Sequence, residues 1–130
     1  MSEKTSADSN ANSRSGSNNK GSVDIRAKSF DEVISGETAV LVDFYADWCA
    51  PCRMMPPILK ELKKRMGDSL TIIKVDTERK PDLAIRYQVR GIPNMILFKK
   101  GKVIWQQAGV MQAAQLEQMI RMKLEEFHEI

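Results

Sequence analysis

The chain of 130 residues contains few of the residues from which cross-links and metal sites are built. Its two cysteines, Cys49 and Cys52, are three residues apart, so a bond between them closes a tiny ring and cannot staple distant segments. The single histidine, His128, stands near the C-terminus and leaves the cysteines short of the four ligands of a closed zinc site. Stability is therefore not the obvious purpose of the two cysteines, and we expect no metal.

Strong charge and long apolar runs are missing as well. Lys and Arg number 20 against 17 Asp and Glu, with no dense basic block, so we expect neither nucleic acid nor a membrane among the partners. The longest apolar runs are far short of a membrane span, and the N-terminus lacks the basic-then-apolar pattern of a signal peptide. We therefore expect a cytoplasmic protein. The alternative is a periplasmic or secreted protein whose leader has been removed.

The first 22 residues differ in composition from the rest. Residues 1–22 are rich in serine and asparagine and contain no large apolar residue except Met1. Such a segment buries too little apolar surface to offset the entropy of ordering it, so we expect a disordered tail. A linker, a spacer left from a processed precursor and a segment added for expression are all consistent with it. Residues 23–130 suffice for one domain with a single hydrophobic core.

From residue 23 the chain alternates short strands with helices. Strands are predicted over residues 23–27, 39–46, 70–76 and the two halves of 94–107, with a turn at Lys100-Gly101. Helices are predicted over residues 29–36, 52–66, 81–89 and 113–127. The alternation indicates an α/β fold with parallel strands and helices on both faces, and the closing hairpin makes the sheet mixed.

Local signals support several of these elements. Ser29 and Glu32 form a capping box at the start of the first helix, and Gly36 marks its end. Residues 39–46, "AVLVDFYA", are an almost continuous apolar run, as expected for a central strand buried on both faces. The helix over 52–66 carries one apolar stripe with steps of three and four residues: Cys52, Met55, Leu59, Leu62 and Met66.

The stretch "DWCAPCRMMPP", residues 47–57, places the two cysteines at the junction of a buried strand and this helix. Cys49 then lies at or just before the helix N-terminus, where free amides and the helix dipole favour an anion. Lowering a thiol pKa from about 8.5 to about 7 ionises roughly half of it at neutral pH. Cys52 belongs to the apolar stripe and should be shielded. An exposed thiolate beside a sheltered partner suits thiol–disulfide exchange.

Other interpretations of the cysteine pair stay open at this point. A bare C-x-x-C pattern also occurs as an inert disulfide, as two core cysteines, or in a zinc site with further ligands. The strand–turn–helix setting favours the redox interpretation.

Three segments together carry a family resemblance. "VDFYADWCAPC" (42–52), "RGIPN" (90–94) and "AGV" (108–110), followed by a C-terminal helix, resemble the thioredoxin family from about residue 24 to the end. The resemblance implies a thioredoxin fold, with a central mixed sheet of four or five strands flanked by four helices. It also implies a monomeric thiol–disulfide oxidoreductase that reduces disulfides in protein substrates. Its electron donor would be NADPH-dependent thioredoxin reductase, and no cofactor would be bound besides the redox-active Cys49–Cys52 disulfide.

The resemblance assigns roles to individual residues. Cys49 resembles the attacking cysteine and Cys52 the resolving one. Asp43, a carboxylate inside an apolar strand, matches an acid that accepts the proton of the resolving cysteine, and burial should raise its pKa. Facing solvent at a strand edge is the alternative for Asp43. Lys74 matches a lysine that pairs with this acid, and an ordinary solvated lysine is the alternative.

The resemblance further implies a substrate platform beside Cys49. Pro93 resembles the family's cis-proline, which exposes backbone to an extended substrate segment in a form of strand addition. Trp48 and Ile92 could alternatively belong to the core, but Trp48 precedes the helix and cannot join its stripe, so we favour the rim. The platform residues are Trp48, Ala50, Pro51, Ile92, Pro93, Ala108 and Gly109.

Several positions depart from the family pattern. Ala50 replaces the usual glycine between the cysteines, but Pro51 is retained, so we expect a reductant. Asn94 replaces the usual threonine, which should alter partner preference. Pro56 precedes the expected Pro57 and should add strain to the helix, and Gln112 is a poor N-cap for the last one. The rivals are an exported reductant or isomerase, and a binding module that uses this surface without redox turnover.

Overall fold

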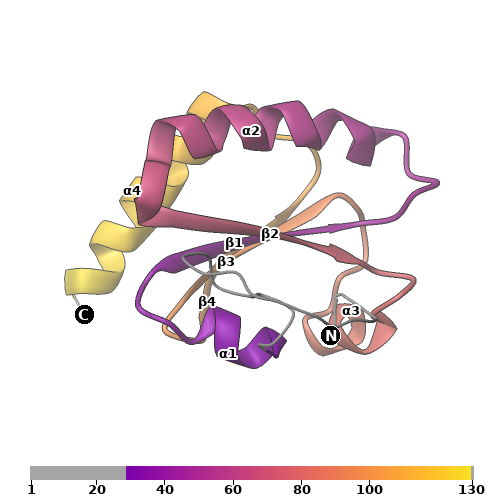
Figure 1. Ribbon diagram of the computed structural model, residues 1–130, viewed down its shortest axis with the longest axis horizontal. Coiled ribbons are helices and arrows are strands. Elements are labelled where there is room, and N and C mark those ends of the chain that lie inside the picture. Colours follow the sequence, from indigo (N-terminus) through magenta and orange to yellow (C-terminus); the bar gives the residue numbers. More distant parts are fainter. Residues whose placement is uncertain (1–28, 130) are drawn as a thin grey trace, which may run out of the picture.

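The computed structural model describes residues 29–129 (Figure 1). The predicted disordered tail over 1–22 and the predicted strand over 23–27 lie outside the described residues. The described strands are β1 (Ala39–Tyr45), β2 (Leu70–Asp76), β3 (Asn94–Lys99) and β4 (Lys102–Ala108). They form one four-stranded sheet in the order β2-β1-β3-β4. The β1–β2 pair is parallel and the β1–β3 and β3–β4 pairs are antiparallel, which confirms the predicted mixed sheet.

Helices cover both faces of the sheet. They are α1 (Phe30–Ile34), α2 (Met55–Met66), α3 (Pro81–Arg86) and α4 (Ala113–Glu129), and short 3₁₀ turns cover Pro51–Met54 and Gly67–Ser69. Figure 1 shows α2 and α4 on one face and α1 and α3 on the other. This is the thioredoxin fold expected from the sequence.

The sheet separates two apolar clusters. On the α2 and α4 side, Leu41 and Leu97 of the sheet pack against Met55, Leu59 and Leu62 of α2, together with the buried residues of α4. All members of the predicted helix stripe, from Cys52 to Met66, are buried. On the α1 and α3 side the cluster is Ile34, Val40, Val42, Phe44, Val75, Leu83, Ile96 and Phe98. Because β1 contributes to both clusters, its near-continuous apolar sequence is explained by burial on two faces.

Helix α1 begins with the predicted capping box. The Glu32 amide donates to Ser29 Oγ over 3.1 Å, and the Ser29 amide donates to Glu32 Oε1 over 2.9 Å. The helix ends at Ile34 with Ser35 as its C-cap, so Gly36 follows the end rather than forming it, and its φ is not positive. The β3–β4 hairpin turns at Lys100 and Gly101, both with positive φ, as the sequence predicts.

The two prolines of "RMMPP" lie where they destabilise the helix little. The chain forms a 3₁₀ turn over Pro51–Met54, and α2 begins only at Met55. Pro56 and Pro57 therefore occupy the first turn of α2, where backbone amides have no partner within the helix. The predicted strain from Pro56 is wrong for this reason. At the start of α4, the Gln115 side chain accepts a hydrogen bond from the Gln112 amide over 3.4 Å, which offsets part of the poor N-cap.

Among residues 29–129, no helix combines the length and the apolar character that crossing a membrane requires.

Candidate active site

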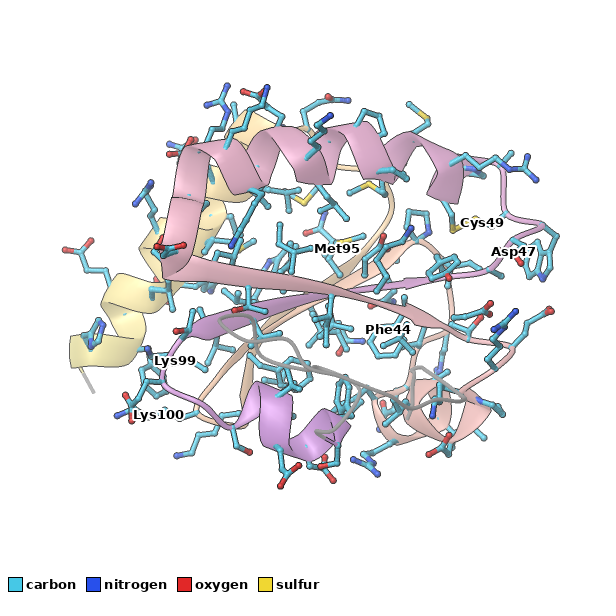
Figure 2. All side chains as sticks on the ribbon, in the orientation of Figure 1. Phe44, Asp47, Cys49, Met95, Lys99 and Lys100 are labelled. Carbon is cyan, nitrogen blue, oxygen red and sulfur yellow. A yellow bond between two sulfur atoms is a disulfide. The ribbon has the colours of Figure 1, made fainter. Side chains whose placement is uncertain are left out.

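Cys49 and Cys52 are joined by a disulfide, so the structure describes the oxidised pair. Cys49 follows the β1 strand and precedes the 3₁₀ turn that runs directly into α2. Figure 2 shows it beneath the N-terminal end of this helical segment, with Asp47 at the outer tip of the loop. Both cysteines pack with Ala46 in a small buried cluster, against which Tyr45 and Ile92 lie. The pair thus stands at the strand–helix junction that the sequence predicts.

The two sulfurs differ in their hydrogen bonds rather than in their exposure. The Cys52 amide donates to Cys49 Sγ over 3.2 Å, and the Ile92 carbonyl oxygen lies 3.7 Å from the same sulfur. Cys49 is 4% exposed and Cys52 is 5% exposed, so the expected contrast in exposure is absent from the oxidised form. The disulfide itself and the neighbouring Ile92 account for the cover over Cys49. An amide aimed at Cys49 Sγ favours negative charge on that sulfur in the reduced protein.

The loop before α2 is held by backbone and guanidinium contacts. The Cys49 amide donates to the Ala46 carbonyl over 3.1 Å, and the Arg53 amide donates to the Ala50 carbonyl over 3.0 Å. The Arg53 guanidinium also donates to the Asp47 carbonyl over 2.8 Å. These contacts bracket Cys49 from both sides and hold it at the mouth of the helix.

Asp43 is buried on the α2 side of the sheet, 1% exposed. It follows Ala39 and Leu41 at the two-residue spacing that keeps side chains on one face of β1, and those two belong to the α2 cluster. Neither carboxyl oxygen has a hydrogen-bond partner among the described residues. Burial raises the pKa of Asp43 to about 6, and the positive charge of Lys74 opposes this rise. The alternative of a solvent-facing carboxylate is wrong.

Lys74 lies directly opposite Asp43 in the parallel β1–β2 register. Its side chain is exposed, and its Nζ sits 4.8 Å from the centre of the Tyr45 ring. The two described side chains form no ion pair, so the lysine acts on Asp43 through the field of its charge and not through a contact. Lys74 is thus a solvated lysine whose charge opposes the pKa rise of Asp43.

The loop after α3 completes the site. The Ile92–Pro93 peptide bond is cis, as the resemblance implies. The Gly109 amide donates to the Pro93 carbonyl over 2.8 Å, and Gly109 has a φ of 101°, which favours glycine there. Ile92 is partly buried against the cysteine cluster, so it combines the core and rim interpretations.

The expected platform residues differ in their exposure. Trp48 is 64% exposed, so it belongs to the rim and not to the core. Its indole N–H donates to Glu78 Oε2 over 2.5 Å, which ties the ring to the loop after β2. Ala50, Pro51, Ala108 and Gly109 are exposed, whereas Pro93 is buried.

Metal binding finds no support in this arrangement. Across the part of the chain that the structure describes, no group of three or more histidine, cysteine, aspartate or glutamate side chains is gathered so that it could hold a metal ion. His128 is in the last turn of α4, which ends on the opposite side of the molecule from Cys49 (Figures 1 and 2).

Sequence reasoning missed two contributors to the site. Glu78 holds Trp48, and Gln106 bonds to Asn94 at the start of β3. Asn94, which was expected to alter partner preference, is buried with 5% of its surface exposed. Glu78 bonds to a residue 30 positions away in the sequence, and Gln106 bonds to one 12 positions away. No local sequence pattern therefore predicts these contacts.

The comparisons agree with this geometry. The family model for thioredoxin matches residues 21–122. Chloroplastic thioredoxin Y of rice (Oryza sativa subsp. japonica) is 46% identical over 98 residues, which cover 75% of this chain and 58% of the rice protein. Thioredoxin 1 of Chlorobaculum tepidum is 39% identical over 95 residues, which cover 72% of this chain and 94% of that protein. A solved mutant thioredoxin of Halobacterium salinarum is 34% identical with a TM-score of 0.65, over 72% of this chain and 80% of that one.

The fold, the cysteine pair and the relatives thus all indicate the same family. The Cys49–Cys52 disulfide is the redox-active group, and thioredoxins bind no further cofactor. The family model covers far more than half of the residues, and the chain spans almost the whole of the bacterial relative but little more than half of the rice protein. The chain belongs to the thioredoxin family of thiol–disulfide oxidoreductases.

Proposed function

We propose that the chain reduces disulfide bonds of protein substrates, with Cys49 as the attacking residue and Cys52 as the resolving one. The observation that carries the proposal is the Cys52 amide aimed at Cys49 Sγ, 3.2 Å away at the start of the helical segment. This amide stabilises a thiolate on Cys49 and has no counterpart at Cys52 among the described hydrogen bonds. This contact supports Cys49 as the attacking residue.

In the first step the Cys49 thiolate attacks one sulfur of the substrate disulfide. A bond forms between Cys49 and that sulfur, the substrate S–S bond breaks, and the second substrate sulfur leaves as a thiolate. In the next step the Cys52 thiol loses its proton and its sulfur attacks Cys49. The mixed disulfide breaks, the substrate leaves with both sulfurs reduced, and the Cys49–Cys52 disulfide forms. Two electrons have then passed from the protein to the substrate.

Asp43 supports the second step as a proton acceptor. Its pKa of about 6 leaves the carboxylate mostly ionised at neutral pH, yet far closer to accepting a proton than a surface aspartate. Neither of its oxygens is occupied by a hydrogen bond among the described residues, so they are available to a proton from Cys52, directly or through water. Lys74 tunes this acceptor through its charge.

The substrate would lie between two sets of residues. Trp48, Ala50 and Pro51 form one side, and the segments 92–93 and 108–109 form the other. The Ile92 amide donates to no acceptor among the described hydrogen bonds. It is therefore available to an extended substrate segment, as in strand addition. We assign the substrate contacts to these residues.

Regeneration needs an external reductant, because the protein ends the cycle oxidised. The family implies NADPH-dependent thioredoxin reductase as the donor, and we propose a monomer in a reducing compartment. The cytoplasm is the first candidate and a plastid is the second, the latter because the rice relative is named chloroplastic. Expression of the full-length protein with a C-terminal tag, followed by fractionation, distinguishes the two.

Insulin-disulfide reduction with dithiothreitol tests the reaction. We expect turnover by the wild type, and a loss on the order of a thousandfold or more in Cys49→Ser, which lacks the attacking sulfur. The matched variant Cys52→Ser should attack once and accumulate the mixed disulfide, which a non-reducing gel detects. A wild-type rate no higher than dithiothreitol alone, with partner binding equal in wild type and Cys49→Ser, would instead indicate a binding module without redox turnover.

A further inference from the structure

Asn94 is a buried polar residue whose amide group is paired at both its nitrogen and its oxygen. Its Nδ2 donates to the Gly91 carbonyl over 3.1 Å, and its Oδ1 accepts from Gln106 Nε2 over 3.2 Å. A buried amide with both ends paired is held in one orientation, because rotation would leave a buried donor or acceptor without a partner. The side chain therefore does not face partners, so its expected influence on partner preference has to act through the groups to which it bonds.

Gln106 anchors this amide to a second part of the molecule. Its Nε2 also donates to the Tyr87 carbonyl, 3.0 Å away, at the residue that caps the C-terminal end of α3. Tyr87 in turn packs against Phe30 and Phe98 in an aromatic cluster. One exposed side chain on β4 thus connects the end of α3 with the start of β3.

The loop between those two elements is the one that carries Ile92. At one end the Gly91 carbonyl is held by Asn94, and at the other end the Pro93 carbonyl is held by the Gly109 amide over 2.8 Å. Between the two anchors, the Ile92 carbonyl lies 3.7 Å from Cys49 Sγ. The position of the Ile92 backbone relative to Cys49 therefore depends on the bond to Asn94.

We propose that Asn94 and Gln106 are positioning residues for the protein substrate: together they hold the Gly91–Pro93 loop so that the Ile92 backbone pairs with the substrate beside Cys49. The inference rests on the proposed disulfide reduction and adds residues that govern substrate binding in it. Neither side chain touches the reacting sulfurs. Their contribution is to substrate affinity and not to the chemistry of Cys49.

Two kinds of disulfide separate these contributions. Insulin has to dock on the loop, whereas the small aromatic disulfide 5,5′-dithiobis(2-nitrobenzoate) needs only the Cys49 thiolate. The decisive variant is Gln106→Glu, which keeps the size of an exposed side chain but replaces its donor amide by an acceptor. Gln107→Glu is the matched control, because it adds the same charge one residue further along β4. Gln107 is also exposed, and its side chain makes no hydrogen bond among the described residues. Asn94→Ala removes the amide from the loop directly.

We expect Gln106→Glu and Asn94→Ala to raise KM for insulin about 3- to 10-fold, the value of one lost hydrogen bond. Their kcat and their rate with the small disulfide should match those of the wild type and of Gln107→Glu. The double variant should raise KM no more than Asn94→Ala alone, because both residues act through one chain of bonds.

Three results would overturn the proposal. One is an unchanged KM for insulin in Gln106→Glu. A second is a parallel fall in both activities, which indicates general damage to the fold. The third is an equal rise of KM in Gln107→Glu, which indicates an effect of charge. Failure of the wild type to reduce insulin, while it still reacts with the small disulfide, would overturn the proposed protein-disulfide reduction and with it this inference, whereas the first three results leave that function standing.

Discussion

Two buried polar side chains stand at the same end of the sheet, on opposite faces, and they are treated in opposite ways. Asp43 pairs with Met95 across the β1–β3 ladder and faces α2, whereas Asn94 pairs with Phe44 and faces α1 and α3. Figure 2 shows Met95 and Phe44 on these two sides. The carboxyl group of Asp43 has no hydrogen-bond partner among the described residues, and the amide of Asn94 has two.

The difference shows which kind of burial serves reactivity and which serves position. Burial without a hydrogen-bond partner disfavours the ionised form of a carboxyl group. The pKa of that group therefore rises, which makes it a better proton acceptor than a surface carboxylate. An amide paired at both its nitrogen and its oxygen stabilises the fold and restrains the groups to which it bonds. In the proposed mechanism, one face of the sheet carries the proton acceptor on the Cys52 side and the other face carries the residue that holds the substrate loop. Four substitutions, in the order of the effect expected, test this contrast.

The largest effect on stability is expected from Asp43→Asn. A rise of the Asp43 pKa from 3.8 to about 6 on folding corresponds to a cost of about 3 kcal/mol at neutral pH. Between these values the unfolded chain loses its proton before the folded one, so the Asp43 contribution to wild-type stability falls as pH rises from about 4 to 6 and is then level. Urea unfolding at several pH values should show Asp43→Asn gaining stability relative to the wild type over this interval and staying more stable at pH 7. A wild type that gains stability relative to Asp43→Asn over the same interval would contradict the account.

Asn94→Ala should act in the opposite direction. It removes two hydrogen bonds from a buried site and leaves their partners to water, so we expect a loss of about 1–2 kcal/mol in the free energy of unfolding. The loss should be the same at pH 4 and pH 7, because no titratable group is involved. A stabilising effect at either pH, measured by the same urea unfolding, would remove the contrast between the two residues.

Much of this arrangement could be predicted from the sequence, because it depends on residues that are close together in the chain. The strand over 70–76 and the helix stripe from Cys52 to Met66 are where their periodicity places them. The capping box of Ser29 and the turn at Gly101 depend on a few adjacent residues and were predicted for that reason.

The rest depended on contacts between distant segments. The Trp48–Glu78 and Asn94–Gln106 bonds join residues that approach only after the sheet has assembled. The burial of Asn94 was not predicted, because the resemblance showed only that an asparagine replaces the usual threonine. The equal exposure of the two cysteines follows from the disulfide and from the contact with Ile92. The apolar periodicity of a helix predicts neither of these.

A smaller effect is expected from Lys74→Met. Lys74 lowers the pKa of Asp43 through its charge, so its removal should move the Asp43 titration further upward. Because Lys74 is exposed and forms no contact with Asp43, water screens it and the change should be less than about one pH unit. The carboxyl carbon chemical shift of Asp43, followed by NMR against pH, measures it. A downward move would show that Lys74 does not act through its charge.

The smallest effect is expected from Glu78→Gln. The exposed Trp48–Glu78 bond holds the indole at the rim, away from both buried groups. Glutamine keeps an oxygen that can accept the indole N–H but loses the charge, so the bond should weaken, stability should fall by less than about 1 kcal/mol, and the pH dependence of unfolding should stay unchanged. A change in that pH dependence would mean that Glu78, and not Asp43 alone, governs the titration.

The most direct test of the account measures which sulfur reacts in the reduced protein. Iodoacetamide labelling at pH 5 to 9, followed by mass spectrometry, gives the alkylation rate of Cys49 and of Cys52 separately. We predict that Cys49 reacts first at pH 7, with a rate midpoint below the value of about 8.5 for a free thiol, and that Cys52 lags behind it. Equal rates for the two residues, both with the midpoint of a free thiol, would contradict the claim that the fold activates one sulfur and holds the other in reserve.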